Sequence, residues 1–228
     1  MPIAFFDLDG TLFDGYTWLS LKRYYELHRF KLPTLYAFLS LHLPAWLLVR
    51  RIEPLRKQLY HAWGANMAWL MRGVPVEQAE TIWDWLVENE ILPKIRPEMK
   101  EATQWHRREG HGIVLLSGAF APLVDRLAER LDVDAALATP LAQRNGHYTG
   151  RIVKPLNIGA AKVQRIKTYL AGLEGNTDLR AAYMYTDSVV DLPVLEIVGN
   201  PVAVYPDQKL MDAAIQRGWD VIGEVTEG

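Results

Sequence analysis

The chain has 228 residues, of which 50% are hydrophobic and 23% charged, an ordinary globular composition that allows one sizeable core and a small accessory domain. The formal net charge of −2 gives no electrostatic reason to expect a nucleic-acid partner. There is no cysteine, which excludes disulfides, thiolate zinc sites and a cysteine nucleophile, and agrees with a reducing, cytoplasmic location.

The first predicted element is a short apolar run over residues 2–6 that ends at Asp7 and Asp9. Acidic residues come too early here for a signal peptide, and no basic region precedes the apolar run. We therefore predict a buried strand that belongs to the fold, with polar side chains at its carboxyl end.

A helical pattern follows between about residues 15 and 92. Apolar residues recur at three- and four-residue steps from Ile52 to Leu70, which marks one face of a helix, and Pro75 suits the first turn of another. We predict a helical cap domain over 15–92, inserted into a catalytic core formed by 1–14 and 93–228.

Six of the eight tryptophans fall in this helical region, namely Trp18, Trp46, Trp63, Trp69, Trp83 and Trp85. The favoured interpretation is that they pack the core of the cap. The alternative is an apolar substrate pocket or a membrane-facing surface, because tryptophan suits boundaries between apolar and polar surroundings.

Residues 32–49 contain no formally charged side chain. An uncharged stretch of this length is at the borderline for a membrane-spanning helix. Pro33 and Pro44 argue against a span, together with His42 and the hydroxyl residues nearby. We favour a bent helix buried in the cap over a helix on a membrane surface, and both over a span.

After residue 92 the pattern alternates between helix and strand. The Asn145-Gly146 pair favours a tight turn in a hairpin over about residues 141–153. Alternation of this kind predicts an α/β fold, a Rossmann-like doubly wound sheet that is mainly parallel. Helices are expected over 97–110, 120–131, from 158 and over 210–215, and strands over 112–116, 181–185 and 202–204.

Polar residues follow three of the predicted strands, and one lysine opens a helix between the second and third. Ligands bind beyond the carboxyl ends of strands in open parallel sheets, so these residues are expected to gather. Converging carboxylates need a cation, and Mg²⁺ suits an all-oxygen set better than zinc does. The residues are Asp7, Asp9, Ser117, Gly118, Lys162, Asp187 and Asp191.

Such a set can transfer a phosphoryl group, which mainly requires positioning and charge neutralisation. One aspartate can act as a covalent nucleophile, and a second, two residues on, can protonate the leaving oxygen and later activate water. The lysine and the cation would attract the phosphate dianion.

Four motifs resemble those of the haloacid dehalogenase superfamily, in the family's order. They are residues 7–12, residues 116–118, Lys162 and residues 187–191. The stretches 97–98, 150–152 and 191–193 are similar to the phosphoserine-phosphatase-like subfamily IB in particular. The insertion between the first and second motifs lies where the family's type-one cap lies.

The resemblance implies a phosphatase that uses Mg²⁺ and an aspartyl-phosphate. Asp7 would be nucleophile and metal ligand, and Asp9 the general acid/base with its backbone carbonyl on the metal. Ser117, Gly118 and Lys162 would hold the phosphoryl group, and Asp187 and Asp191 would bind Mg²⁺, the latter directly or through water. Thr186 stands where many members have glycine, and we expect it to leave the metal site intact.

Two alternatives stay open beside phosphatase activity: phosphotransfer or mutase activity through the same aspartyl-phosphate, and a non-catalytic phosphate-binding module. A phosphoserine enzyme should offer an acidic pair after the first motif, whereas residues 14–18 contain one carboxylate, Asp14. We therefore expect a small phosphorylated metabolite, with an amphiphilic or aromatic character suggested by the apolar cap. Peripheral membrane contact is not favoured.

Overall fold

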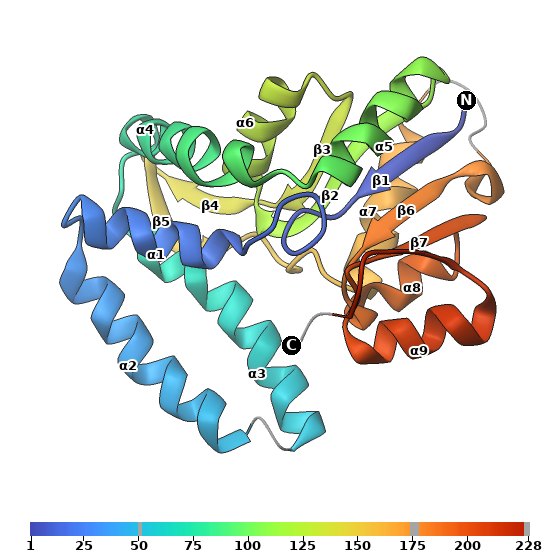
Figure 1. Cartoon of the computed structure of the whole chain (residues 1–228). Helices are drawn as coiled ribbons and strands as arrows, with labels where there is room; N and C mark the ends of the chain where they lie inside the picture. Colours follow the sequence, from blue (N-terminus) through green and yellow to red (C-terminus); the bar gives the residue numbers. More distant parts are fainter. Residues whose placement is uncertain (50–51, 174–177, 226–228) are drawn as a thin grey trace.

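The computed structural model describes residues 1–49, 52–173 and 178–225 (Figure 1). Its main feature is a parallel six-stranded sheet in the order β3-β2-β1-β6-β7-β8. The strands are β1 (Ile3–Phe6), β2 (Gly112–Phe120), β3 (Ala135–Thr139), β6 (Tyr183–Thr186), β7 (Asn200–Val204) and β8 (Asp220–Ile222). The edge strands β3 and β8 were not predicted from the sequence.

Both faces of the sheet are covered, which explains why the central strands are apolar throughout. On one face Phe6 and Leu115 pack with α5 (Pro97–Arg108) and α6 (Ala121–Leu131). On the other, Phe5 and Leu116 pack with α7 (Ala160–Ala171), α8 (Leu192–Leu195) and α9 (Gln208–Arg217). The prediction of a doubly wound α/β fold is confirmed.

The register of the central strands decides which polar residues meet. Phe6 on β1 pairs with Leu115 on β2 and with Tyr185 on β6. The backbone N–H of Asp7 then donates to the carbonyl of Tyr185 over 2.9 Å. All three motif-bearing strands are therefore neighbours and end at the same edge of the sheet.

The segment between β1 and β2 is helical, as predicted. Ahead of α5, its elements are α1 (Thr17–Leu27), α2 (Leu32–Val49), α3 (Glu53–Asn66), η1 (Met67–Met71), α4 (Val76–Leu86), η2 (Val87–Ile91) and η3 (Leu92–Lys94). The apolar face expected from Ile52 to Leu70 starts as an α-helix and continues in the tighter 3-10 geometry from Met67. The domain boundaries themselves stay a prediction.

The predicted hairpin forms from β4 (Leu141–Arg144) and β5 (His147–Ile152), and Asn145 and Gly146 both have positive φ, as this turn requires. The hairpin is hydrogen-bonded to the helical insertion. The Gly73 N–H donates to the Tyr148 carbonyl over 2.7 Å, and the Tyr148 N–H to the Val74 carbonyl over 3.0 Å. The hairpin thus fastens the insertion to the sheet domain.

Helix α2 is only partly buried. Leu35, Phe38 and His42 are covered, whereas Leu47 is 61% and Leu48 80% exposed. The α2–α3 pair projects away from the sheet (Figure 1), so the second half of α2 has little to pack against. The expected buried helix is therefore buried in its first half alone. Among the described residues, no helix is both long and apolar enough to cross a membrane.

A buried histidine connects α5 to the sheet. His106 is fully buried, with its Nε2 3.0 Å from the Tyr185 hydroxyl and its Nδ1 2.8 Å from Nδ1 of His111. Phe6 contacts the His106 ring edge-on. Burial, and then the nearby His111, lower the pKa of His106 from its ordinary 6.5 to about 4. The folded state therefore favours the neutral imidazole of His106.

We expect His106 to make the fold sensitive to mild acid. Because its pKa is lower in the folded than in the unfolded chain, the unfolded state binds more protons between about pH 6.5 and pH 4. The stability that His106 contributes is therefore full above pH 6.5 and is lost as the pH falls, on the order of 2 kcal/mol. The test is urea unfolding of wild type and His106→Gln across this range.

The difference in unfolding free energy between the two proteins should shrink as the pH falls from 7 to 4. The exposed His147→Gln is the matched control and should show a constant difference. A His106→Gln difference that does not change with pH would mean that the buried imidazole does not titrate in this way.

Candidate active site

Asp7 follows β1 directly and forms an ion pair with the buried Lys162 at the start of α7. The Lys162 Nζ lies 3.0 Å from Asp7 Oδ1 and 2.5 Å from Asp191 Oδ2. Lys162 is 2% exposed and Asp191 3% exposed. Burial lowers the pKa of Lys162, but Asp191 and Asp7 raise it more, so the ammonium stays charged. A single buried cation therefore bridges the first and fourth motifs.

Asp7 itself has a pKa well above the ordinary carboxyl value. Burial is the main cause, partly offset by Lys162, and the negative charges of Asp191 and Asp187 raise the pKa further. The Leu8 N–H donates to Asp7 Oδ1 over 2.8 Å and helps to fix the side chain. One lysine does not neutralise this group of carboxylates, so the site has an excess of negative charge that favours a cation.

Asp187 follows β6 and lies against the backbone of the first motif. The Thr11 hydroxyl donates to its Oδ1 over 3.2 Å. A Cβ on Gly10 would lie 2.2 Å from Asp187 Oδ2, closer than real atoms approach. Burial, then the charge of Asp191, raise the pKa of Asp187 to about 7. The absence of a side chain at Gly10 in the first motif therefore leaves room for the Asp187 carboxylate of the fourth motif.

We expect Gly10→Ala to impair metal-dependent activity by displacing Asp187. Gly10 has a φ of +72°, so an alanine is also strained there. The concentration of Mg²⁺ needed for half-maximal activity should rise about 10-fold or more. Gly146→Ala is the matched control, since its φ is +73° with no atom within 4 Å of the added Cβ. Equal effects of both substitutions would assign the loss to backbone strain instead.

Asp9 points toward the helical insertion. The Thr17 N–H and hydroxyl donate to its two carboxylate oxygens over 2.8 and 2.9 Å. Burial raises the pKa of Asp9 to about 6, against the smaller lowering effect of these two bonds. A carboxyl group with a pKa near 6 can both give and take a proton near neutral pH. Thr17 was not singled out from the sequence, because its bond to Asp9 depends on the direction of α1.

The second motif lies on β2 next to Asp7. Ser117 is buried, and its Oγ accepts from the Ala119 N–H over 3.1 Å. Helix α6 begins only at Ala121, so Ser117 is not its N-cap. Asn157 donates its side-chain amide to the Ser117 carbonyl over 3.0 Å, and Thr139 donates to the Gly118 carbonyl over 2.9 Å. These two supporting residues were missed, and nothing in their spacing from Ser117 points to them.

Asp191 makes contacts on both oxygens. Oδ1 accepts from the Gly159 N–H over 3.2 Å, and Oδ2 from Lys162 and from the Thr186 hydroxyl over 3.1 Å. This geometry favours contact with a metal through water over direct coordination, since three donors already occupy most of the lone-pair sites of the Asp191 carboxylate. Thr186 stands where many members of the haloacid dehalogenase superfamily have glycine. Its hydroxyl group holds the Asp191 side chain in place.

Within residues 1–49, 52–173 and 178–225, no three His, Asp or Glu side chains are close enough together to hold a metal ion as they stand. The physical reason is that Asp191 turns to Lys162 and Asp9 to Thr17. Mg²⁺ does not require three ligating side chains, because it commonly binds through one or two carboxylates and keeps several waters. Asp7 and Asp187, with the Asp9 carbonyl, are oxygen donors that fit this requirement.

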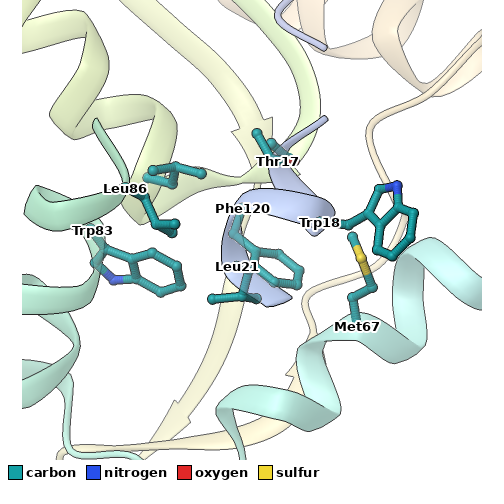
Figure 2. Close-up of a pocket in the computed structure, with 9 residues that line it drawn as sticks. Thr17, Trp18, Leu21, Met67, Trp83, Leu86 and Phe120 are labelled. Atoms are coloured by element: carbon teal, nitrogen blue, oxygen red, sulfur yellow. The ribbon is translucent and has the colours of Figure 1, made fainter. Parts of the chain in front are cut away.

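A small cavity lies between the insertion and the second motif (Figure 2). Its volume is about 10 Å³, roughly the room that one water needs, so it does not admit a substrate group as it stands. Trp18, Trp83 and Phe120 are among the aromatic side chains around it. All six tryptophans of the insertion are buried or half-buried, which favours the packing interpretation.

The parallel sheet, with the buried Lys162 and four aspartates gathered at one of its edges, is the arrangement of an α/β enzyme with an acidic active site. The chain matches the model of the haloacid dehalogenase-like hydrolases over residues 4–196, and it belongs to this family. A phosphoserine phosphatase of Mycobacterium tuberculosis is 31% identical over 224 residues, with 96% of this chain and 69% of the relative covered. A histidinol-phosphatase of Neisseria meningitidis is 29% identical over 161 residues, 69% of this chain and 71% of the relative. Together with the family match, these relatives confirm a phosphatase of the phosphoserine-phosphatase-like type.

Solved structures confirm the fold. A protein of unknown function from Bordetella pertussis superposes with a TM-score of 0.74 at 24% identity, covering 97% of this chain and 98% of the other. A phospho-aspartyl intermediate analogue of phosphoserine phosphatase gives a TM-score of 0.63 at 18% identity, covering 99% and 94%. At these identities the likeness extends to the fold alone.

Proposed function

We propose that this phosphatase hydrolyses a small phosphate monoester through an aspartyl-phosphate on Asp7, with Mg²⁺ as cofactor. The observation that supports it is the ion-pair group at the sheet edge, in which Lys162 bridges Asp7 and Asp191 while Asp187 adds further negative charge nearby. The raised pKa of Asp7 and Asp187, caused by burial and by neighbouring negative charges, supports a site that favours an additional positive charge.

In the first half-reaction, a carboxylate oxygen of Asp7 attacks phosphorus and the ester P–O bond breaks. Asp9 gives its proton to the departing oxygen, so the organic product leaves as an alcohol. Lys162 and the backbone N–H of Gly118 hold the phosphoryl oxygens. When bound, Mg²⁺ would neutralise charge on the phosphoryl group and on Asp7. The residues suited to hold it are Asp7, the Asp9 carbonyl and Asp187, with Asp191 beyond them.

In the second half-reaction, water attacks the phosphorus of the aspartyl-phosphate, and Asp9, now ionised, takes a proton from it. The acyl-phosphate P–O bond breaks, which returns Asp7 and releases inorganic phosphate. A pKa near 6 suits Asp9 to both roles, since neither form is strongly disfavoured near neutral pH.

The relatives act on phosphoserine and on histidinol phosphate, which makes small metabolite phosphates the first class to test. Asp14, the single carboxylate that follows the first motif, pairs with Arg96 over 2.9 Å. Its charge is therefore already compensated, which argues against phosphoserine. A leaving group of amphiphilic or aromatic character remains our proposal, and we propose a cytoplasmic location with no stable membrane attachment.

The test is phosphate release by the pure protein with Mg²⁺ from a panel of amino-acid, sugar, aryl and lipid monoesters. Free phosphate in amounts equal to the alcohol product supports hydrolysis. Phosphate that reappears on an acceptor would instead show phosphotransfer or mutase activity. Turnover of no monoester in the panel, by protein shown to be folded, would contradict the proposal and favour a non-catalytic phosphate-binding module.

A further inference from the structure

Tyr60 lies on the side of α3 that faces the sheet domain. It precedes Gly64 by four residues and Met67 by seven, so the three positions share one helix face. A Cβ on Gly64 would lie 2.7 Å from Leu156 Cδ2, and Met67 lines the small cavity beside Phe120 (Figure 2). Both contacts are with the sheet domain, which identifies the direction of the shared face.

The part of the sheet domain that α3 approaches belongs to the active site. Leu156 is followed by Asn157, whose amide binds the carbonyl of Ser117 in the second motif. Gly64 permits this close approach, although a glycine within a helix is destabilising relative to alanine. Tyr60 continues the same face by one turn beyond Gly64.

Tyr60 is half-exposed, one turn along α3 from the close contact of Gly64 with Leu156. It is 48% exposed, yet surrounding protein is the main cause that raises its pKa. The negative charges of the four active-site aspartates raise the pKa further, in the order Asp9, Asp7, Asp191 and Asp187. The Tyr60 ring is therefore accessible to solvent and lies within reach of the charge of these four aspartates.

Tyr16 is a second tyrosine in the same surroundings. It precedes α1 and is 46% exposed, and after burial the charges of Asp187 and Asp9 raise its pKa. Two half-exposed phenol groups, one from the loop before α1 and one from α3, therefore lie near the same carboxylates. Each offers a flat apolar face and one neutral hydroxyl to whatever stands over Asp7.

We propose that Tyr60 is a specificity-determining residue that packs its ring against the organic part of the substrate, so that the site prefers phosphate monoesters with a flat aromatic group next to the ester oxygen. This inference rests on the proposed function, since it assumes that the phosphoryl group lies at Asp7. Aromatic pairs contribute about 0.5–1.5 kcal/mol beyond burial, which corresponds to a preference of about 2- to 10-fold.

The test measures binding instead of turnover. Phenylphosphonate, methylphosphonate and 2-aminoethylphosphonate cannot be hydrolysed as esters, and their affinities with Mg²⁺ can be measured by calorimetry. The proteins are wild type, Tyr60→Phe, Tyr60→Ala and Tyr36→Ala. Tyr36 is a matched control because it is 50% exposed on α2, and α3 lies between α2 and the sheet domain (Figure 1).

We expect Tyr60→Ala to weaken phenylphosphonate binding about 3- to 10-fold with little effect on methylphosphonate. Tyr60→Phe, which keeps the ring, should retain at least half of the wild-type affinity, and Tyr36→Ala should match wild type. An unchanged affinity ratio in Tyr60→Ala would overturn the inference. So would a loss of phenylphosphonate affinity in Tyr60→Phe as large as in Tyr60→Ala, which would assign the contact to the hydroxyl.

If Tyr60→Ala lost the most affinity for 2-aminoethylphosphonate, this would also overturn the inference, in favour of a cation held over the ring. These outcomes are separate from failure of the proposed function. A protein that binds phosphonates selectively but releases no phosphate would contradict hydrolysis and leave the role of Tyr60 standing. A protein that hydrolyses monoesters with no dependence on Tyr60 would support hydrolysis and contradict the role of Tyr60.

Discussion

Asp7→Asn should reduce phosphate release by a factor of at least about 10³, because the amide cannot form the covalent phosphoryl bond. The same substitution should leave the melting temperature in the absence of Mg²⁺ unchanged or higher. The pKa of Asp7 is raised well above its value in an unfolded chain, so the ionised carboxylate is less favourable in the folded state at pH 7. A neutral amide of the same shape removes this cost.

Both readouts come from one preparation, by phosphate assay and by thermal unfolding with and without Mg²⁺. Wild type should gain stability when Mg²⁺ is added, and Asp7→Asn should gain less because it offers one fewer anionic ligand. Asp14→Asn is the matched control, since Asp14 belongs to the same loop but pairs with Arg96 at the surface. More than a tenth of wild-type activity in Asp7→Asn would rule Asp7 out as the nucleophile.

Lys162→Met is expected to impair both stability and activity. Removing one partner of a buried ion pair typically costs about 3–5 kcal/mol, because the remaining charges are left uncompensated. Asp7 and Asp191 both lose their cation here, and a domain of this size should melt roughly 10 °C lower. Phosphate release should fall by about 10² or more through the loss of charge stabilisation at the phosphoryl group.

The loss of stability in Lys162→Met should depend on pH in a defined direction. Without the lysine, the pKa of Asp7 is raised further above its unfolded value, so the cost grows as the pH rises and shrinks as Asp7 is protonated. The variant should therefore come closer to wild type at pH 5 than at pH 8. Lys22→Met is the control, because its ion pair with Glu26 is at the surface and contributes at most about 0.5 kcal/mol. A melting temperature equal to that of the control would show that Lys162 is not buried between the two carboxylates.

Much of the site could be predicted from local sequence. Asp7 and Asp187 each follow an apolar strand, and parallel strands end at one edge of the sheet. Their proximity therefore follows from topology, and the register of β1 with β6 shows it. The Asn145-Gly146 turn was predictable for the same kind of reason, since a two-residue hairpin needs positive φ at both positions.

Other features depend on contacts between distant segments. Thr17 binds Asp9, Asn157 supports Ser117 and Thr186 orients Asp191, and each of these side chains has an ordinary polar identity with no distinguishing spacing. His106 is a similar case, because its burial results from the way α5 packs on β6 and not from its neighbours in sequence.

The sequence by itself determined the doubly wound fold, the helical insertion and the identity of the charged residues, because strand and helix periodicity and the strand ends are local properties of the chain. Tertiary structure alone decided which two carboxylates Lys162 meets, which half of α2 is covered and that Tyr60 lies on the face of α3 that approaches the sheet domain. These depend on the angle at which the insertion packs on the sheet. That angle is set by contacts such as Gly64 against Leu156, between residues 92 positions apart, to which no local pattern in the chain points.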